Sequence, residues 1–410
     1  MSEVDTARHV VIVGASLAGS RTAQGLRSAG FDGPITLVGA EAEIPYDRPP
    51  LSKDLLKGPW NEEAVAAVRL VSTTELSGLG VELRLGVAAT GLDLEHRRVR
   101  LADDTVLDYD VLVIATGAAA RPSPWRPPSG VYQLRTLADS AAIAKRLALG
   151  EPVVVVGGGF IGTEIAAAAR GHGCEVVVVD PIPEPMTRLV GPEIADSLVG
   201  LHRHNGAETR FGVGVVDILG SDGALTVKLS DGTELRASTA VVGIGSVPST
   251  GWLEGSGLTL DNGVVTDGFL RAVGTEDVYA IGDVARWPHP GHGTLIRAEH
   301  WTNASDQARY IATAIAHGGA EQPYNSSDYV WSEQYDWKVN SVGWRDPEGR
   351  STVVGDLGTT GRVAVIHEDA AGTAVGAVTV NWVKALNQAR RLLAAGGPAT
   401  TIIEQLEQLV

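Results

Sequence analysis

Two short apolar runs in this chain are each followed by a glycine-rich turn and then by an alanine-rich stretch. Residues 10–13 and 153–156 contain only valine and isoleucine, and the turns after them span residues 14–19 and 157–162. Such a pattern predicts a buried strand, a tight turn and a helix whose N-terminal N–H groups face a pyrophosphate. One copy is a weak signal, but two copies predict two dinucleotide sites in one chain.

The second turn fits the dinucleotide pattern at every glycine position. Gly157 permits the tight turn, Gly159 lets a pyrophosphate approach the backbone, and Gly162 allows the helix to pack closely on the strand. The apolar run 176–179 then ends in Asp180, about 20 residues further on, where a carboxylate can bind a ribose diol. Because a carboxylate repels a 2′-phosphate, Asp180 favours NADH, while Arg188 nearby leaves NADPH open as an alternative.

The first turn departs from the pattern, because Ser16 stands where the middle glycine is expected. A small residue still permits close approach, and residues 35–38 supply the second strand of a βαβ unit. Gly39 occupies the expected position of the ribose-binding acid, so we assign that role to Glu41. The alternative for either turn is a tight connection in an α/β domain that binds nothing.

The remaining pattern predicts an α/β fold with two Rossmann-like domains, one inserted in the other, and a C-terminal α+β domain. Further apolar strands are expected at 109–117, 240–245 and 278–283, and a proline-rich crossing lies at 121–128. From about residue 323, five short strands and two amphipathic helices are expected, with bounds 329–334, 338–343, 351–355, 362–367, 374–380, 382–395 and 400–409. The predicted domains are 1–117 and 246–322 for FAD, 118–245 for NADH, and 323–410 at the C-terminus.

Composition and charge exclude several classes of protein. The net charge of −16 argues against nucleic acid or an anionic membrane as a partner. Cys174 is the single cysteine, so neither a disulfide nor a dithiol redox pair can form within the chain. No apolar run is long enough to span a bilayer. The segment 1–8 is short, polar and partly acidic, and the first strand is expected directly after it, so we expect no signal peptide and a cytoplasmic location.

Several motifs resemble the FAD-dependent ferredoxin reductases of bacterial cytochrome P450 and ring-hydroxylating dioxygenase systems, the putidaredoxin reductase type. The resemblance covers nearly the whole chain. It rests on the two turns and on the motifs PYDRPPLSK, ATG, AIGD, EHWTNA and WSEQYD, which begin at Pro45, Ala115, Ala280, Glu299 and Trp331.

The resemblance implies roles for individual residues. Lys53 resembles a lysine beside the hydride-accepting edge of the flavin. Glu164 resembles a residue that contacts the nicotinamide and forms an ion pair with Lys53. Trp301 resembles an aromatic residue that packs against the flavin. The implied FAD site comprises Gly14, Ser16, Leu17, Ala18, Gly19, Glu41, Arg48, Pro49, Lys53, Ala89, Thr116, Gly117, Arg135, Asp283 and Trp301. The implied NAD site comprises Gly157, Gly159, Phe160, Ile161, Gly162, Glu164, Asp180, Arg188, Gly243, Ile244 and Gly245.

Each implied role has a structural alternative. Asp283 could cap a helix at 284–287, and Lys53 could be a solvated loop lysine. Arg135 could form a surface salt bridge. Glu164 could do no more than interact favourably with the dipole of its own helix. His289, His292 and His300 lack the spacing of a zinc site, so no metal is expected.

These observations predict an NADH-dependent FAD enzyme that passes electrons to an iron-sulfur ferredoxin serving a cytochrome P450 or a dioxygenase, as a monomer or weak dimer. One alternative is an NADH oxidase or a reductase of quinones or radicals. Another is a flavoprotein similar to apoptosis-inducing factor, in which NADH switches conformation or assembly.

Overall fold

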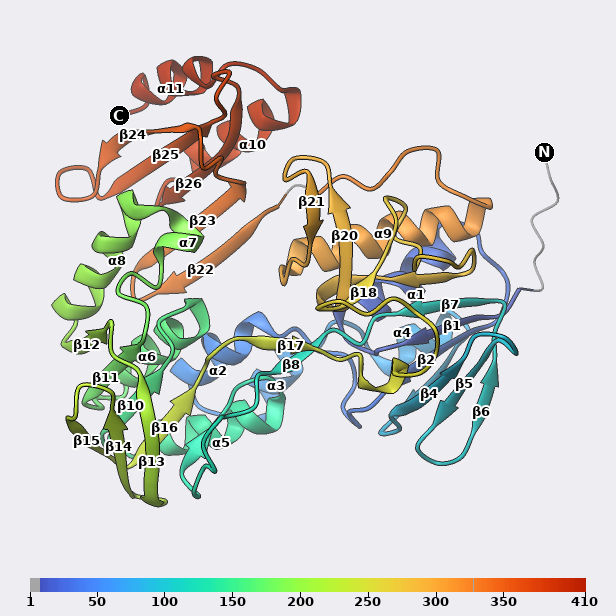
Figure 1. Ribbon diagram of the computed structural model, residues 1–410, viewed down its shortest axis with the longest axis horizontal. Coiled ribbons are helices and arrows are strands. Elements are labelled where there is room, and N and C mark those ends of the chain that lie inside the picture. The colour runs from blue at the N-terminus through green and yellow to red at the C-terminus, as the bar shows by residue number, and fades with distance from the viewer. Residues whose placement is uncertain (1–7, 327) are drawn as a thin grey trace. The chain divides into compact units, whose positions relative to one another are not determined.

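The computed structural model describes residues 8–326 and 328–410, and these form two compact units (Figure 1). The first unit contains the described parts of residues 1–47, 66–119 and 246–327, and the second contains residues 48–65, 120–245 and 328–410. Residues 1–7, in which no signal peptide was expected, lie outside the described chain.

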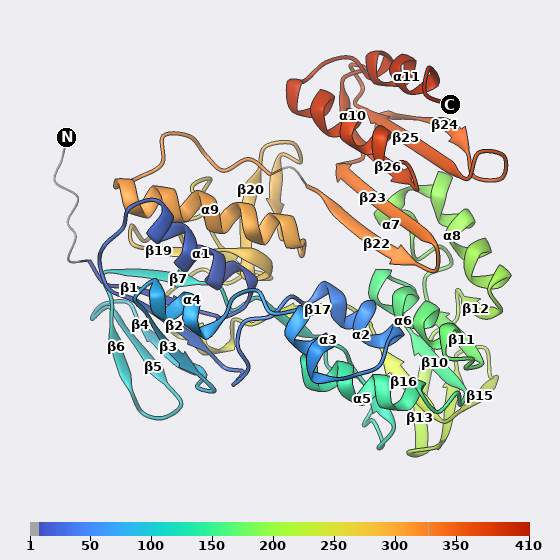
Figure 2. The ribbon, with the colours of Figure 1, turned by 180° about the vertical axis from the view of Figure 1, so that it is seen from behind.

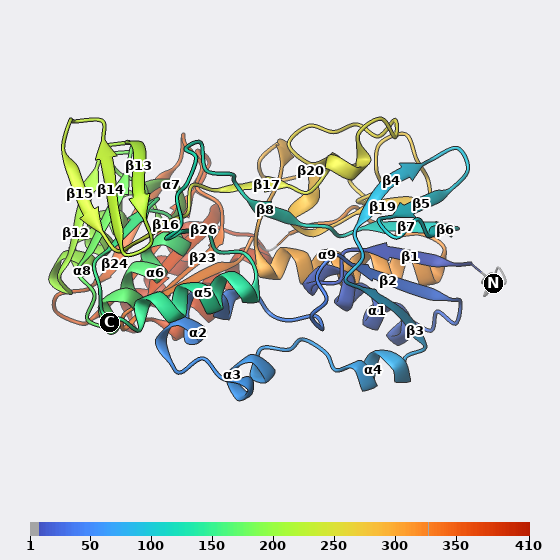
Figure 3. The ribbon, with the colours of Figure 1, turned by 90° about the horizontal axis from the view of Figure 1, so that it is seen from below.

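The first unit is built on a five-stranded parallel sheet with the order β19-β7-β1-β2-β3. Helices cover one of its faces and a three-stranded antiparallel sheet, β4-β5-β6, covers the other (Figure 3). Helices α1 and α9 lie side by side on the helical face (Figure 2). The elements are β1 Val10–Val13, α1 Leu17–Ser28, β2 Ile35–Gly39, β3 Val81–Leu85, β4 Ala89–Asp93, β5 Arg98–Leu101, β6 Val106–Asp108, β7 Val111–Ile114, β19 Val278–Ala280 and α9 Trp301–His317.

The second unit repeats this construction on a parallel sheet with the order β12-β11-β10-β16-β9. Helices α5 and α6 pack on one face, and the antiparallel sheet β13-β14-β15 packs on the other. The elements are β9 Val131–Tyr132, α5 Leu137–Leu147, β10 Val153–Val156, α6 Phe160–Gly171, β11 Val176–Asp180, β12 Ala207–Phe211, β13 Val215–Ser221, β14 Ala224–Leu229, β15 Glu234–Ala237 and β16 Thr239–Val242.

The C-terminal part of the second unit is an antiparallel sheet with the order β22-β23-β26-β25-β24. Helices α10 and α11 bury apolar side chains against one face, and α8 does so against the other. The bounds are α8 Pro192–His204, β22 Val330–Gln334, β23 Trp337–Gly343, β24 Arg350–Asp356, β25 Arg362–Glu368, β26 Ala374–Val380, α10 Val383–Ala395 and α11 Ala399–Glu407.

The predicted fold class is therefore confirmed, but one local expectation is wrong. Residues 284–287 do not form a helix that Asp283 could cap, because Asp283 lies in a 3-10 turn that leads directly into strand β20. No helix of the described residues has the length and apolarity to cross a membrane.

The remaining short elements are η1 Pro49–Ser52, α2 Asp54–Lys57, α3 Glu62–Ala67, α4 Thr73–Gly78, β8 Ala118–Ala120, α7 Thr187–Val190, β17 Ser246–Pro248, η2 Gly251–Leu253, β18 Val264–Val265, η3 Gly282–Val284, β20 Ala285–His289 and β21 Thr294–Ile296.

The two glycine-rich turns share one geometry. Gly14 and Gly157 have φ values of +119° and +116°, which an L side chain rarely adopts. A Cβ at Gly19 would lie 1.9 Å from the Gly14 carbonyl oxygen, and a Cβ at Gly162 would lie 2.0 Å from the Gly157 carbonyl oxygen. In contrast, a Cβ at Gly159 would meet no heavy atom within 4 Å. The first and last glycines are therefore required by the fold, whereas the middle position needs only open space.

This difference predicts that two alanine substitutions in one turn destabilise the protein to different extents. Gly162→Ala should lower the free energy of unfolding by at least about 2 kcal/mol, because the added carbon overlaps a backbone oxygen. Gly159→Ala should cost less than about 1 kcal/mol, since it loses only helix-capping preference. Chemical denaturation followed by circular dichroism measures both values, and equal stability of the two variants would contradict the packing argument.

Candidate dinucleotide and redox site

The carboxyl edge of the first unit's sheet gathers the residues predicted to hold FAD. Gly14 follows β1, Glu41 follows β2, Thr116 follows β7, and Asp283 follows β19. Because these four strands are parallel neighbours, their carboxyl ends share one edge. This edge is where an open α/β sheet binds a ligand.

The turn at this edge accommodates serine at its middle position. Ser16 is the N-cap residue of α1 with φ −111°, an extended conformation that any residue adopts, and its side chain makes no capping hydrogen bond. Leu17, Ala18 and Gly19 form the first turn of α1. The helix N-terminus can therefore present backbone N–H groups to a pyrophosphate, as the glycine pattern requires.

Two further residues of the first unit hold predicted site residues in place, and the sequence analysis had not singled them out. The Tyr46 hydroxyl donates a hydrogen bond to the Glu41 carboxylate. The Trp301 indole Nε1–H donates to Asp47 Oδ1 at 2.7 Å. Both Tyr46 and Asp47 belong to the motif before Arg48, so the motif itself was the available signal.

The second unit has a corresponding sheet edge, which gathers residues predicted to hold NADH. Gly157 follows β10, Asp180 ends β11, and Gly243, Ile244 and Gly245 follow β16, all of them parallel neighbours. The open space at Gly159, the N-cap of α6, leaves the helix N-terminus accessible to a pyrophosphate. The residues of both edges thus fit dinucleotides.

The Asp180 carboxylate is built into this turn. Its Oδ2 accepts a hydrogen bond from the Gly158 N–H at 2.7 Å, and its Oδ1 accepts one from the Ile182 N–H at 2.8 Å. The residue is only 8% exposed. Each oxygen keeps a lone pair for a ribose hydroxyl, so the backbone bonds fix the carboxylate without using up its acceptor capacity.

The other predicted residues are placed as follows. Arg48 donates from Nη1 to the Arg135 carbonyl oxygen, and both residues lie in the second unit, as do Pro49 and Lys53. Ala89 begins β4, and Gly117 follows β7 with φ +66°. Phe160 is half-buried and Ile161 is exposed in the first turn of α6. Arg188 lies in α7, and its side chain is outside the described residues.

Lys53 and Glu164 form a buried ion pair in the second unit. Lys53 Nζ donates to Glu164 Oε2 at 2.8 Å, and the two residues are 8% and 2% exposed. The structure therefore does not place Lys53 as a solvated loop residue. Lys53 follows η1, and Glu164 lies in the second turn of α6, beyond the first turn in which a helix dipole chiefly acts, so the dipole alone does not account for this carboxylate.

Two serines complete the environment of the Glu164 carboxylate. Ser52 Oγ donates to Oε2, and Ser332 Oγ donates to Oε1 at 2.6 Å. The sequence analysis missed both serines as site residues. Both serines lie in motifs that carried the resemblance, Ser52 beside Lys53 and Ser332 in WSEQYD, but no local pattern links Ser332 to a residue 168 positions away.

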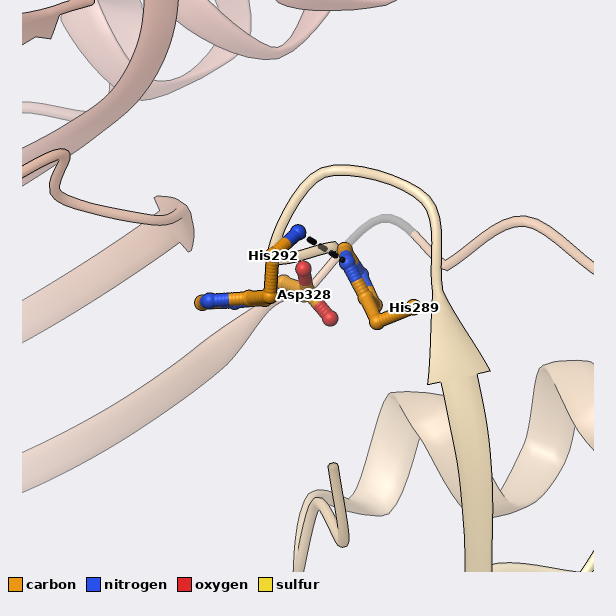
Figure 4. Close-up of side chains that lie close together, drawn as sticks. All are labelled: His289, His292 and Asp328. Carbon is orange, nitrogen blue, oxygen red and sulfur yellow. Dashed lines mark hydrogen bonds between the residues drawn. The ribbon is translucent and has the colours of Figure 1, made fainter. Parts of the chain in front are cut away.

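His289 and His292, for which no metal was expected, lie at the turn between β20 and β21 (Figure 4). Their ring centroids are 4.7 Å apart, and His289 Nδ1 accepts hydrogen bonds from the backbone N–H groups of Gly291 and His292. Figure 4 also draws Asp328, a residue of the second unit. The histidines thus have a structural role in closing the turn, and the absence of a metal stays a prediction.

Burial predicts strong coupling between Lys53 and Glu164. Glu164→Gln alone should lower the free energy of unfolding by about 3 kcal/mol, because it leaves a buried ammonium group without an anion. The double variant with Lys53→Met should recover much of this loss. The matched control is the exposed pair Lys228 and Glu234, whose coupling should stay below about 1 kcal/mol. Double-mutant cycles in chemical denaturation measure both, and equal coupling energies would contradict this assignment.

Comparison with known proteins places these features in a family. Residues 8–308 match the family described as pyridine nucleotide-disulphide oxidoreductase, and residues 329–403 match the family described as reductase C-terminal. Rhodocoxin reductase of Rhodococcus erythropolis is 39% identical over 82% of this chain and 78% of its own length. The ferredoxin–NAD(+) reductase component of the anthranilate 1,2-dioxygenase system of Burkholderia cepacia is 36% identical over 94% of each chain.

A solved structure agrees with the sequence matches. The covalent complex of putidaredoxin reductase with putidaredoxin contains a chain that superposes with a TM-score of 0.89 at 31% identity, covering 98% of this chain and 99% of the other. With three quarters of its residues inside the first family match and most of the remainder inside the second, the chain belongs to the pyridine nucleotide-disulphide oxidoreductases and carries their reductase C-terminal domain.

Proposed function

We propose that this chain is an NADH:ferredoxin oxidoreductase with bound FAD. Electrons from NADH pass through the flavin and leave singly to an iron-sulfur ferredoxin, which feeds a cytochrome P450 or a ring-hydroxylating dioxygenase. The observation that carries the proposal is the presence of two dinucleotide cradles, one in each unit, in a chain with a single cysteine.

The first unit supplies most of the proposed FAD site. Its α1 N-terminus faces the pyrophosphate, Glu41 binds the adenosine ribose, and Asp283 contacts the ribityl chain. Trp301 lies against the flavin, with its ring orientation fixed by Asp47. The FAD domain that we propose at 1–117 and 246–322 overlaps most of this unit, but residues 48–65 group with the second unit. Arg48, Pro49, Lys53 and Arg135, which the resemblance also assigns to the FAD site, belong to the second unit.

The second unit supplies the proposed NADH site at 118–245. Asp180 binds the adenosine ribose, and the turn at Gly159 receives the pyrophosphate. When bound, FAD supplies both two-electron and one-electron chemistry, so this chain needs no nucleophile or acid-base pair of its own. Glu164 orients Lys53 through their ion pair and would contact the nicotinamide, and the Lys53 ammonium would stabilise the negative charge of a reduced flavin.

The isolated cysteine and the relatives together indicate where the electrons go. Cys174 is buried, and burial raises the pKa of its thiol, so this side chain is not poised for thiol chemistry. Members of the wider family that carry electrons through a dithiol need a second cysteine, which this chain lacks. The relatives named above serve rhodocoxin, putidaredoxin and a dioxygenase system, so a ferredoxin is the proposed acceptor. A cytoplasmic monomer or weak dimer that binds no nucleic acid belongs to the same proposal.

The Asp180 carboxylate should set the choice of nicotinamide nucleotide. We expect a higher kcat/KM for NADH than for NADPH, because the fixed carboxylate repels a 2′-phosphate. Asp180→Asn keeps an acceptor oxygen for the turn but removes the charge, and should reduce this preference about tenfold. Steady-state kinetics with both nucleotides measures it, and equal kcat/KM values in the unsubstituted protein would remove the argument.

The function itself is tested by NADH-driven reduction of cytochrome c through purified candidate ferredoxins. We expect turnover that depends on both FAD and ferredoxin, with little oxygen consumption when ferredoxin is omitted. Cys174→Ala is the matched control, and its turnover should equal that of the unsubstituted protein because no thiol takes part.

Three other results would contradict the proposal. Rapid oxygen or quinone reduction without ferredoxin would identify a small-molecule reductase. Very slow turnover together with NADH-dependent dimerisation would identify a switch protein. Loss of turnover in Cys174→Ala at unchanged stability would reveal thiol chemistry.

A further inference from the structure

The Glu164 carboxylate lies at the end of a buried series of hydrogen-bonded side chains, referred to below as the polar chain, which continues into the C-terminal domain. Ser332 donates to its Oε1, while Lys53 and Ser52 donate to its Oε2. Ser332 lies on β22, which packs beside α6 (Figure 1), and is fully buried. The C-terminal domain therefore reaches the same carboxylate as Lys53 does, but through the opposite oxygen.

Three more side chains extend this chain behind Ser332. Gln334 Nε2 donates to Ser332 Oγ at 3.2 Å, and His202 Nε2 lies 2.9 Å from Gln334 Oε1. The Tyr335 hydroxyl lies 3.3 Å from His202 Nδ1. Gln334 is fully buried and His202 is 3% exposed, so water does not replace these contacts.

The charge on Glu164 dictates the direction of every bond in this chain. A carboxylate only accepts, so Ser332 must give it its proton and present its oxygen to Gln334. The Gln334 amide nitrogen then faces Ser332, its amide oxygen faces His202, and His202 must carry its proton on Nε2.

The protonation states that the chain needs are the ones that burial favours. Burial lowers the pKa of His202, against a smaller opposing effect of its bond to Gln334, so a neutral ring with one donor and one acceptor results. Burial also raises the pKa of Tyr335 to about 12, which keeps its hydroxyl protonated as the donor to His202 Nδ1. Donors that all point one way polarise one another and strengthen the last bond, the one to Glu164.

We propose that Ser332 and Gln334 of the C-terminal domain, together with His202 of α8, are positioning residues for hydride transfer, which fix the orientation of the Glu164 carboxylate. This inference rests on the proposed function, because it assumes that Glu164 meets the nicotinamide. It assigns the C-terminal domain a part in the reaction with NADH, through atoms that touch neither nucleotide.

The kinetic test compares serine variants in anaerobic stopped-flow reduction of the bound flavin by NADH. Ser332→Ala should lower the rate constant at saturating NADH about tenfold, the loss of one hydrogen bond to a charged group, while NAD⁺ affinity changes less than threefold. Ser332→Cys keeps a weak donor of similar size and should lose less.

Ser351→Ala is the matched control in the same domain. Its hydroxyl bonds to His367 Nδ1 at 2.9 Å in a neighbouring strand pair, and neither residue belongs to the chain that ends at Glu164. It should react at the unsubstituted rate. The proposal is overturned if Ser332→Ala also reacts at that rate, or if Ser351→Ala slows equally, since the effect would then reflect stability alone.

A second readout does not depend on turnover. Nitrogen-15 NMR of histidine-labelled protein, with His202→Gln to identify the resonance, should show a neutral ring protonated at Nε2 near pH 7. A ring protonated at Nδ1, or a cationic ring, would overturn the proposal whatever the rates of the serine variants. NADH could fail to reduce the unsubstituted protein while NMR shows the Nε2–H form of His202. That result would contradict the proposed function but would support the series of hydrogen bonds from His202 to Glu164.

Discussion

A buried ion pair between Lys53 and Glu164 is the interaction on which the organisation of the second unit depends. The two charges lie 2.8 Å apart with little exposure to water, and removing charged groups from water costs several kcal/mol unless other polar groups replace the solvent. The replacements come from Ser52 beside the lysine and from Ser332 on β22. Three segments distant in the sequence must therefore meet at one carboxylate, which explains why residues 48–65 and the C-terminal sheet belong to the same compact unit as α6.

The glycine-rich turns of the two units have the same backbone geometry, which lets a strand, a tight turn and a helix pack closely together. Both turns need glycine where φ is positive and where the helix crosses a carbonyl oxygen, because neither place has room for a Cβ. Both tolerate variation at the N-cap, where Ser16 and Gly159 adopt extended backbone. The departure of the first turn from the glycine pattern thus has no structural consequence.

The sequence was sufficient for elements whose environment is uniform along the chain. Continuous apolar runs located the central strands, and short runs separated by turn residues located the five C-terminal strands to within one residue at each end. The antiparallel sheets β4-β5-β6 and β13-β14-β15 were not predicted, since their short strands mix exposed and buried positions. Glycine at 282 and the acid after it suggested a helix cap, but β20 pairs with β18 and β21 and draws the segment into a sheet instead.

The site residues also divide into those that the sequence could predict and those whose roles depend on tertiary packing. Lys53 and Glu164 were expected as a pair from the resemblance, and the structure joins them. Ser332 and Gln334 lie in the motif WSEQYD, but their contacts and that of His202 could not be predicted, because they arise only when β22, α8 and α6 pack together. The backbone contacts of Asp180 were likewise invisible in the sequence, which specifies a carboxylate but not its partners.

The most direct test of the account is an anaerobic titration of the purified protein with NADH, followed by its visible absorption. The account predicts a yellow protein whose flavin absorption is bleached by about one equivalent of NADH, because FAD accepts one hydride. A protein that stays colourless after incubation with FAD, or a yellow protein that NADH does not bleach, would contradict it.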